Sequence, residues 1–92
     1  MHPELARYLE QLAELPDYEG IVLTSVNQKD RFGGTPLHAA VIQNRVDMVL
    51  LLLKHGADIN APGERGETPL QTALVMDNQG IAELLLREGA KK

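Results

Sequence analysis

The 92-residue chain contains no cysteine and no tryptophan, and it has only one phenylalanine and two tyrosines. Without cysteine it can form neither a disulfide nor a thiolate metal site, and it has no thiol nucleophile. Because aromatic side chains are so few, the core must be built from Leu, Val, Ile and Ala, which suits stacked helices. At this length we expect one small domain, near the size at which a single hydrophobic core becomes marginal.

Basic residues are also scarce, since nine Lys and Arg stand against thirteen Asp and Glu and give a formal net charge of −4. Nucleic-acid-binding proteins usually carry a basic patch, so we expect no nucleic-acid partner and favour a neutral or basic protein. No apolar run approaches the ~20 residues of a membrane-spanning helix. The charges of Glu4, Arg7 and Glu10 leave no apolar signal-peptide core. We therefore expect no membrane partner and a cytoplasmic location.

What the chain does contain is an internal repeat. Residues 34–40 read GTPLHAA and return 33 residues later, at 67–73, as ETPLQTA. Matches at the same offset continue outside this string, with Gly33 and Gly66, Gly56–Ala57 and Gly89–Ala90, and Leu51–Leu53 and Leu84–Leu86. So many matches at one fixed offset, without a gap, indicate a repeat architecture.

The Thr-Pro-Leu-His-x-Ala string at this period resembles the ankyrin repeat family, from about Val26 to the C-terminus. The resemblance implies a mostly α-helical ankyrin repeat solenoid with β-hairpin fingers. We predict a single domain, 1–92, made of an N-terminal cap at 1–26 and repeats at 27–59 and 60–92.

The N-terminal cap is predicted to be a helix over residues 2–15. Proline suits the first helical position, and Pro16 ends the helix. The apolar stripe of this helix comprises Leu5, Tyr8, Leu9, Leu12 and Leu15. Residues 17–27 depart from the family pattern. We expect a turn at 17–20 and an extended segment at Ile21–Val26, with a short irregular helix as the alternative.

Within the repeats, Thr-Pro at 35–36 and 68–69 predicts the start of each inner helix. The outer helices are expected at Val46–Lys54 and Ile81–Arg87, with buried positions at Val46, Met48, Val49, Leu52 and Leu53. Asn44 is expected to be left-handed in the turn between the first two helices.

Three positions depart from the family pattern. Leu50 stands where the family usually has a charge, so it either packs under the N-terminal segment or is an exposed contact residue. Gly63 replaces the usual Asp, which predicts an irregular second finger. The last repeat has no separate cap, and its polar Gln71, Gln79 and Glu83 favour self-capping, with a second molecule stacking end to end as the alternative.

The sequence contains no convincing catalytic or metal-binding motif. In ankyrin repeats the motif histidine, His38 here, is structural and bonds the motif threonine and the neighbouring unit, and Gln71 takes its place in the second copy. His2 and His55 have no partner at metal-ligand spacing. We therefore expect no enzyme activity, no metal and no cofactor.

The resemblance implies a protein–protein interaction module, possible roles being an inhibitor or an immunity-type protein. We expect a monomer; the alternative is a structural or oligomerisation unit. Each group of candidate contact residues has a structural alternative. Phe32 could pack against Tyr18, and the other finger-tip residues could form a plain solvated loop. The apolar inner-helix residues could pack between helices. The matching finger-tip positions are Arg31, Phe32, Gly34, Glu64, Arg65 and Glu67, and the matching inner-helix positions are Ile42, Gln43, Val75 and Met76.

Overall fold

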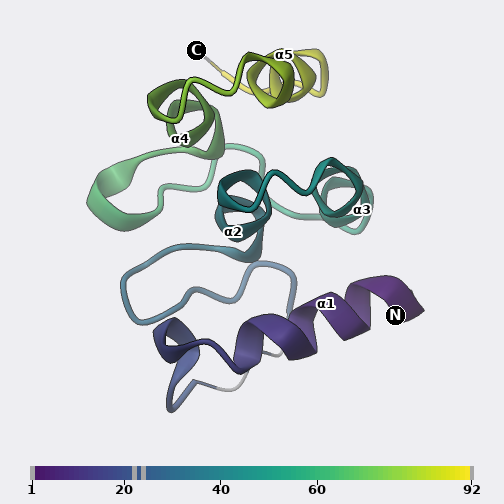
Figure 1. Ribbon diagram of the computed structural model, residues 1–92, viewed down its shortest axis with the longest axis vertical. Coiled ribbons are helices and arrows are strands. Elements are labelled where there is room, and N and C mark those ends of the chain that lie inside the picture. Colours follow the sequence, from purple (N-terminus) through teal and green to yellow (C-terminus); the bar gives the residue numbers. More distant parts are fainter. Residues whose placement is uncertain (1, 22, 24, 92) are drawn as a thin grey trace.

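A computed structural model describes residues 2–21, 23 and 25–91. The chain forms five α-helices in these residues, and they stack as layers along the longest axis of a 32 × 28 × 18 Å body (Figure 1). The pair α2 and α3 lies between α1 on one side and the pair α4 and α5 on the other (Figure 1). The helices are α1 (Pro3–Ala13), α2 (Pro36–Ile42), α3 (Val46–Lys54), α4 (Pro69–Val75) and α5 (Gln79–Arg87).

The N-terminal helix α1 begins at Pro3, as predicted, and His2 Nδ1 accepts a hydrogen bond from Glu4 N at 3.2 Å to cap it. Four residues of the predicted stripe are buried, namely Leu5, Tyr8, Leu9 and Leu12. The helix ends at Ala13, and Leu15 adopts an extended backbone before Pro16, which disfavours the helical conformation of its predecessor. Leu15 is therefore exposed, and its predicted place in the buried stripe is wrong.

The segment after α1 turns twice before the first repeat. Pro16–Tyr18 forms one turn of 3-10 helix, and a bond from Ile21 N to Tyr18 O at 2.9 Å closes a turn in which Gly20 has φ +79°. Val22 and Thr24 lie outside the described residues, so the prediction of an extended Ile21–Val26 segment stays a prediction. Tyr18 is buried and joins the cap to the core.

Both inner helices begin with the same reciprocal cap. Thr35 Oγ1 accepts from the N–H of the third helical residue, His38, while His38 Nδ1 accepts from Thr35 N at 3.2 Å. Thr68 and Gln71 repeat this arrangement at the start of α4. These caps satisfy backbone N–H groups that a helix N-terminus otherwise leaves unpaired. The predicted helix starts are confirmed.

The turns between paired helices are left-handed, as expected for Asn44. Asn44 and Asp77 both have φ +57°, and Asn78 Nδ2 donates to Asn44 Oδ1 at 2.9 Å across the repeats. Asn78 Oδ1 also accepts from Ile81 N at 3.2 Å and so caps α5. Because this cap lies before Gln79, α5 begins two residues earlier than the predicted Ile81.

The fingers are tight turns rather than paired strands. The outermost backbone bond runs from Asp30 N to Gly34 O at 2.8 Å in the first finger and from Gly63 N to Glu67 O at 2.7 Å in the second. Each encloses a tighter turn bond, from Gly33 N to Asp30 O at 3.2 Å and from Gly66 N to Gly63 O at 2.9 Å. Throughout the described part of the chain no strand is formed, so the β-hairpin character predicted for the fingers is not seen. These bonds are too few for a ladder. Lys29 Nζ donates to Pro62 O at 3.1 Å and links the two fingers.

The core is built almost entirely from aliphatic residues of the five helices. Three of the buried positions expected on α3 are confirmed, at Met48, Val49 and Leu52. Val46 is exposed because it opens the helix, so its predicted burial is wrong, and Leu53 is only partly buried. Leu50 is 42% exposed, which favours the exposed alternative over packing under the N-terminal segment.

Candidate protein-binding surface

A hollow of about 170 Å³ opens between the first turn after α1, helix α2 and the two fingers. Thr35, His38 and Ala39 contribute to its lining from α2 and the residue that caps it. Phe32 and Gly34 reach it from the first finger, and Glu64 and Glu67 from the second. The hollow therefore brings together residues from both repeats and the cap, which are far apart in the sequence.

The first finger is held in place by its own aspartate and by the cap. Asp30 Oδ1 accepts from Phe32 N at 2.8 Å and from Gly34 N at 2.9 Å, the local bonding that makes Asp favourable in turns. Arg31 N donates to Asp17 O at 2.8 Å, and Arg31 Nη1 lies 3.7 Å from Glu19 Oε2. These contacts fix the finger tip against the cap segment.

Phe32 remains outside the core although it lines the same hollow as the buried Tyr18. Its side chain is 55% exposed, and both aromatic residues line the hollow. Packing of Phe32 fully against Tyr18 is therefore not observed. The ring is the largest apolar surface that the first finger offers to a partner.

His38 has both ring nitrogens engaged. Nε2 lies 2.7 Å from Glu67 O, the bond that ties the first repeat to the second, and Nδ1 lies 2.7 Å from Thr35 Oγ1. Because the carbonyl oxygen can only accept, Nε2 carries the proton and Nδ1 accepts. Burial lowers the pKa of His38, so the ring is neutral near pH 7. The structural role expected of this histidine is confirmed.

The apolar inner-helix positions face solvent. Val75 is 74% exposed, and Ile42 and Met76 are also exposed, so the alternative of packing between helices is wrong. Ile42 lines the hollow. Arg65, in the left-handed conformation with φ +63°, lies with Glu64 and Glu67 at a separate shallow depression of the second finger.

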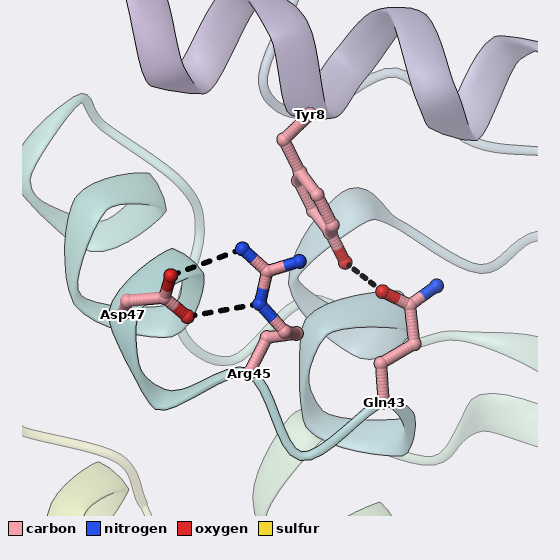
Figure 2. A network of polar contacts seen from close by, with 4 residues as sticks. All are labelled: Tyr8, Gln43, Arg45 and Asp47. Atoms are coloured by element: carbon pink, nitrogen blue, oxygen red, sulfur yellow. Dashed lines mark hydrogen bonds and ion pairs between the residues drawn. The ribbon is translucent and has the colours of Figure 1, made fainter.

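Gln43 is already engaged within the chain. Tyr8 Oη donates to Gln43 Oε1 at 2.9 Å, and Figure 2 shows this bond reaching from α1 to the end of α2. Beside it, Arg45 pairs with Asp47 through two bonds of 3.0 Å, and Arg45 Cζ lies 5.5 Å from the centre of the Tyr8 ring (Figure 2). Burial raises the pKa of Tyr8 to about 12, so the hydroxyl keeps its proton. Gln43 thus contributes to fastening the cap.

This fastening was missed from the sequence because 35 residues separate Tyr8 and Gln43, and no spacing rule connects them. The rings of His2 and His55 also meet, with centroids 6.0 Å apart. No group of three His, Cys, Asp or Glu side chains suited to a metal ion occurs among residues 2–21, 23 and 25–91. In that same part of the chain, none of the helices has both the length and the apolar character needed to cross a membrane.

Capped inner helices, left-handed turns and bonds repeating at a fixed offset define a stacked helical repeat protein. For example, Asn27 Oδ1 accepts from Asp58 N at 2.8 Å, and 33 residues later Asn60 Oδ1 accepts from Lys91 N at 3.0 Å. A family model of ankyrin repeats, in three copies, matches residues 2–92. The chain belongs to the ankyrin repeat family. The match starts well before Val26, where the sequence resemblance was expected to begin.

Curated relatives are similar over short stretches. The palmitoyltransferase akr1 of Aspergillus oryzae (strain ATCC 42149 / RIB 40) is 54% identical over 39 residues, which are 42% of this chain and 5% of the relative. The putative ankyrin repeat protein FPV233 of Fowlpox virus (strain NVSL) is 47% identical over 38 residues, 40% of this chain and 7% of the relative. The human ankyrin repeat and SOCS box protein 5 is 56% identical over 34 residues, 37% of this chain and 10% of the relative.

The chain therefore spans a tenth or less of the length of these relatives. Ankyrin repeats are generally protein–protein interaction modules, and the family is generally non-enzymatic.

Proposed function

We propose that this chain binds a partner protein through the hollow, the finger tips and the exposed side of the inner helices. The observation that carries the proposal is the set of exposed apolar side chains Phe32, Ile42, Val75 and Met76, held on capped helices and a braced turn. A surface that is already ordered loses little conformational entropy on association. Aromatic side chains and methionine are enriched in such interfaces.

The remaining tip positions complete the proposed surface. Arg31, Glu64 and Arg65 are exposed, and Gly34 and Glu67 are half-buried at the hollow. We propose that Gln43 borders the surface and supports it through Tyr8. Within this proposal the chain is a cytoplasmic monomer that blocks or masks a neutral or basic protein, as an inhibitor or immunity-type protein would.

The test compares two variants in affinity capture from cells, with quantitative mass spectrometry and then titration of the recovered partner. Arg31→Glu with Phe32→Ala should abolish capture and leave the melting temperature nearly unchanged, because both side chains are exposed and the lost Arg31–Glu19 pair is a solvent-exposed one. The matched control is Val46→Ala, which shortens an exposed apolar side chain at the start of α3, outside the proposed surface. Equal capture by the finger variant and the wild type would contradict the proposal.

A second candidate function is end-to-end assembly through the last repeat. Val41 is fully buried on α2, a helix that packs against α4, whereas Leu74, 33 residues later, is 58% exposed, and Leu86 is also exposed. The expected polar residues Gln71, Gln79 and Glu83 are exposed as well, which supports self-capping. Light scattering across a concentration range separates the two. A concentration-dependent oligomer that Leu74→Asp disperses would favour assembly.

A further inference from the structure

Within residues 2–21, 23 and 25–91, the charged residues that line the hollow are all acidic. The residues that line it include four acidic ones, Asp17, Asp30, Glu64 and Glu67. The described lining also includes two other titratable residues, Tyr18 and His38, and burial lowers the pKa of His38 so that it carries no charge near pH 7. Among the residues that the structure describes, no lysine or arginine lines the hollow.

The neighbouring basic side chains make other contacts, although the charge of Lys29 acts on His38. Arg31 lies 3.7 Å from Glu19, and Lys29 donates to Pro62 O in the link between the fingers. Arg65 lines the separate depression on the second finger. The carboxylates of the hollow are therefore not neutralised by basic side chains of its own lining.

The same hollow has an apolar part. Leu15, Phe32 and Ile42 line it, and all three side chains are exposed although they are large and apolar. With a volume of about 170 Å³ the hollow is smaller than the ~300–1,000 Å³ of typical small-molecule pockets. It suits one long side chain better than a separate ligand.

These features select the kind of side chain that fits. A purely apolar anchor would take carboxylates out of water without a partner, which is costly. An acidic anchor would meet like charge. Lysine and arginine combine an apolar stem with a charged end, and the arginine guanidinium also stacks on aromatic faces and pairs with carboxylates.

We propose that the hollow receives a lysine or arginine side chain from a basic segment of the partner protein. Its stem lies against Phe32 and Ile42, and its charged end lies among Asp17, Glu64 and Glu67. Asp30 contributes its negative charge without bonding the anchor directly, because its Oδ1 already accepts two backbone N–H groups. This inference rests on the proposed function and specifies the chemistry of the partner.

The probe is a set of three synthetic peptides of equal length that differ only in a central arginine, glutamine or glutamate flanked by leucines. Binding is followed by two-dimensional amide NMR. The arginine peptide should shift the resonances of Gly34, His38 and Ile42 in a salt-dependent way, and the other two peptides should bind more weakly. Equal binding of the arginine and glutamine peptides, or no shifts with the arginine peptide at millimolar concentration, would overturn the proposal.

Two matched variants change the net charge of the protein by the same amount, one at the hollow and one away from it. Glu64→Gln with Glu67→Gln should weaken binding of the arginine peptide about two- to thirty-fold, as expected for two partly screened ion pairs. Glu83→Gln with Glu88→Gln, on and directly after α5, should leave it unchanged. An equal loss in both variants would show a general charge effect and overturn the proposal.

The outcome is separable from that of the proposed function. If the Arg31→Glu and Phe32→Ala change abolishes partner capture while Glu64→Gln with Glu67→Gln leaves capture intact, the surface binds protein but the basic-anchor proposal is wrong. If the finger variant captures the partner as well as the wild type does, the proposed function itself is wrong.

Discussion

The two repeats have nearly the same local structure but differ in what buries them. Both begin with a Thr-Pro cap and turn through a left-handed residue with φ +57°. Yet Val41 is fully buried, while Leu74 at the equivalent position is 58% exposed. Helix α2, which carries Val41, packs against α4 of the second repeat, whereas no helix of the described chain follows the second repeat over Leu74. Burial in a stacked repeat is thus set by the neighbouring repeat as much as by the sequence pattern.

The N-terminal caps of the two inner helices also differ in whether they contact a neighbouring repeat. His38 and Gln71 each accept from the N–H of the threonine that caps their helix. Only His38 also contacts the following repeat, through Glu67 O. The motif histidine therefore couples two repeats, whereas Gln71 serves its own helix.

The largest effect is expected from charging the two equivalent apolar positions. Val41→Asp places an unpaired carboxylate in the core between repeats, and should cost roughly 3–5 kcal/mol of unfolding free energy. For a domain this small, such a loss approaches the total stability. Leu74→Asp should change stability little, because its side chain already meets water. Urea denaturation followed by circular dichroism measures both. A large loss in Leu74→Asp would show that this position is covered in solution.

The next effect separates the two caps. His38→Gln imports the residue of the second repeat, keeps the local cap and removes the contact with Glu67 O. Glu67 O keeps its bond from Gly63 N, but the interface between the repeats loses a hydrogen bond and part of a buried ring. We therefore expect a loss of about 1–3 kcal/mol at pH 7. Gln71→Ala should cost only about 1 kcal/mol, the usual effect of a weakened cap. Similar losses would contradict a coupling role for His38.

The same variant tests pH dependence. Burial lowers the pKa of His38 in the folded protein below its ordinary 6.5, so the unfolded chain binds the extra proton more readily. The contribution of neutral His38 to the unfolding free energy is therefore complete at pH values above the ordinary pKa. It is lost as the pH falls through and below that pKa. The wild type should lose more stability between pH 7 and pH 5 than His38→Gln does. Parallel curves would mean that His38 does not titrate in this way.

Gly63 allows the difference between the fingers to be tested. A Cβ at this position would lie 2.6 Å from His38 Nε2, and that ring cannot easily move because both its nitrogens are engaged. Gly63→Ala should cost about 1–3 kcal/mol by overpacking. The control is the same change in a His38→Ala background, where the penalty should largely disappear. A penalty that persists there would come from the backbone and not from the ring.

The sequence was informative wherever a feature depends on nearby residues. Thr35 and Thr68 identified the helix starts, and Asn44 identified a left-handed turn, because caps and turns involve residues three or four apart. Gly63 was recognised as a departure from the family pattern. The reason for a glycine at this position was not predictable, since it is the close approach of the His38 ring from the other repeat.

The candidate surface shows the same division. The repeat pattern selected Phe32, Glu64 and Glu67 as finger-tip positions and Ile42 as an inner-helix position, and all four line the hollow. It did not show that Gln43 bonds Tyr8, or that Leu15 and Asp17 of the cap complete the lining. These contacts depend on how α1 and the turn after it settle against the stack, and that part of the sequence departs from the repeat.

The smallest predicted effect concerns the second residue of each outer helix. Gly80 lies in α5, is exposed, and a Cβ there would meet Asn78 Oδ1 at an ordinary 3.7 Å. Gly80→Ala should therefore stabilise the protein by about 0.5–1 kcal/mol, because glycine loses more conformational freedom on folding. The equivalent Asp47 in α3 pairs with Arg45 through two 3.0 Å bonds.

The reciprocal Asp47→Gly should lower stability by at least the same amount, with the exposed ion pair adding about 0–1 kcal/mol. Thermal unfolding of both variants gives the comparison directly. A gain from Gly80→Ala would show that the outer helix of the last repeat is limited by its own backbone. No gain would mean that the end of α5 near Asn78 frays, and that a neighbour beyond Leu74 and Leu86 is needed to hold it.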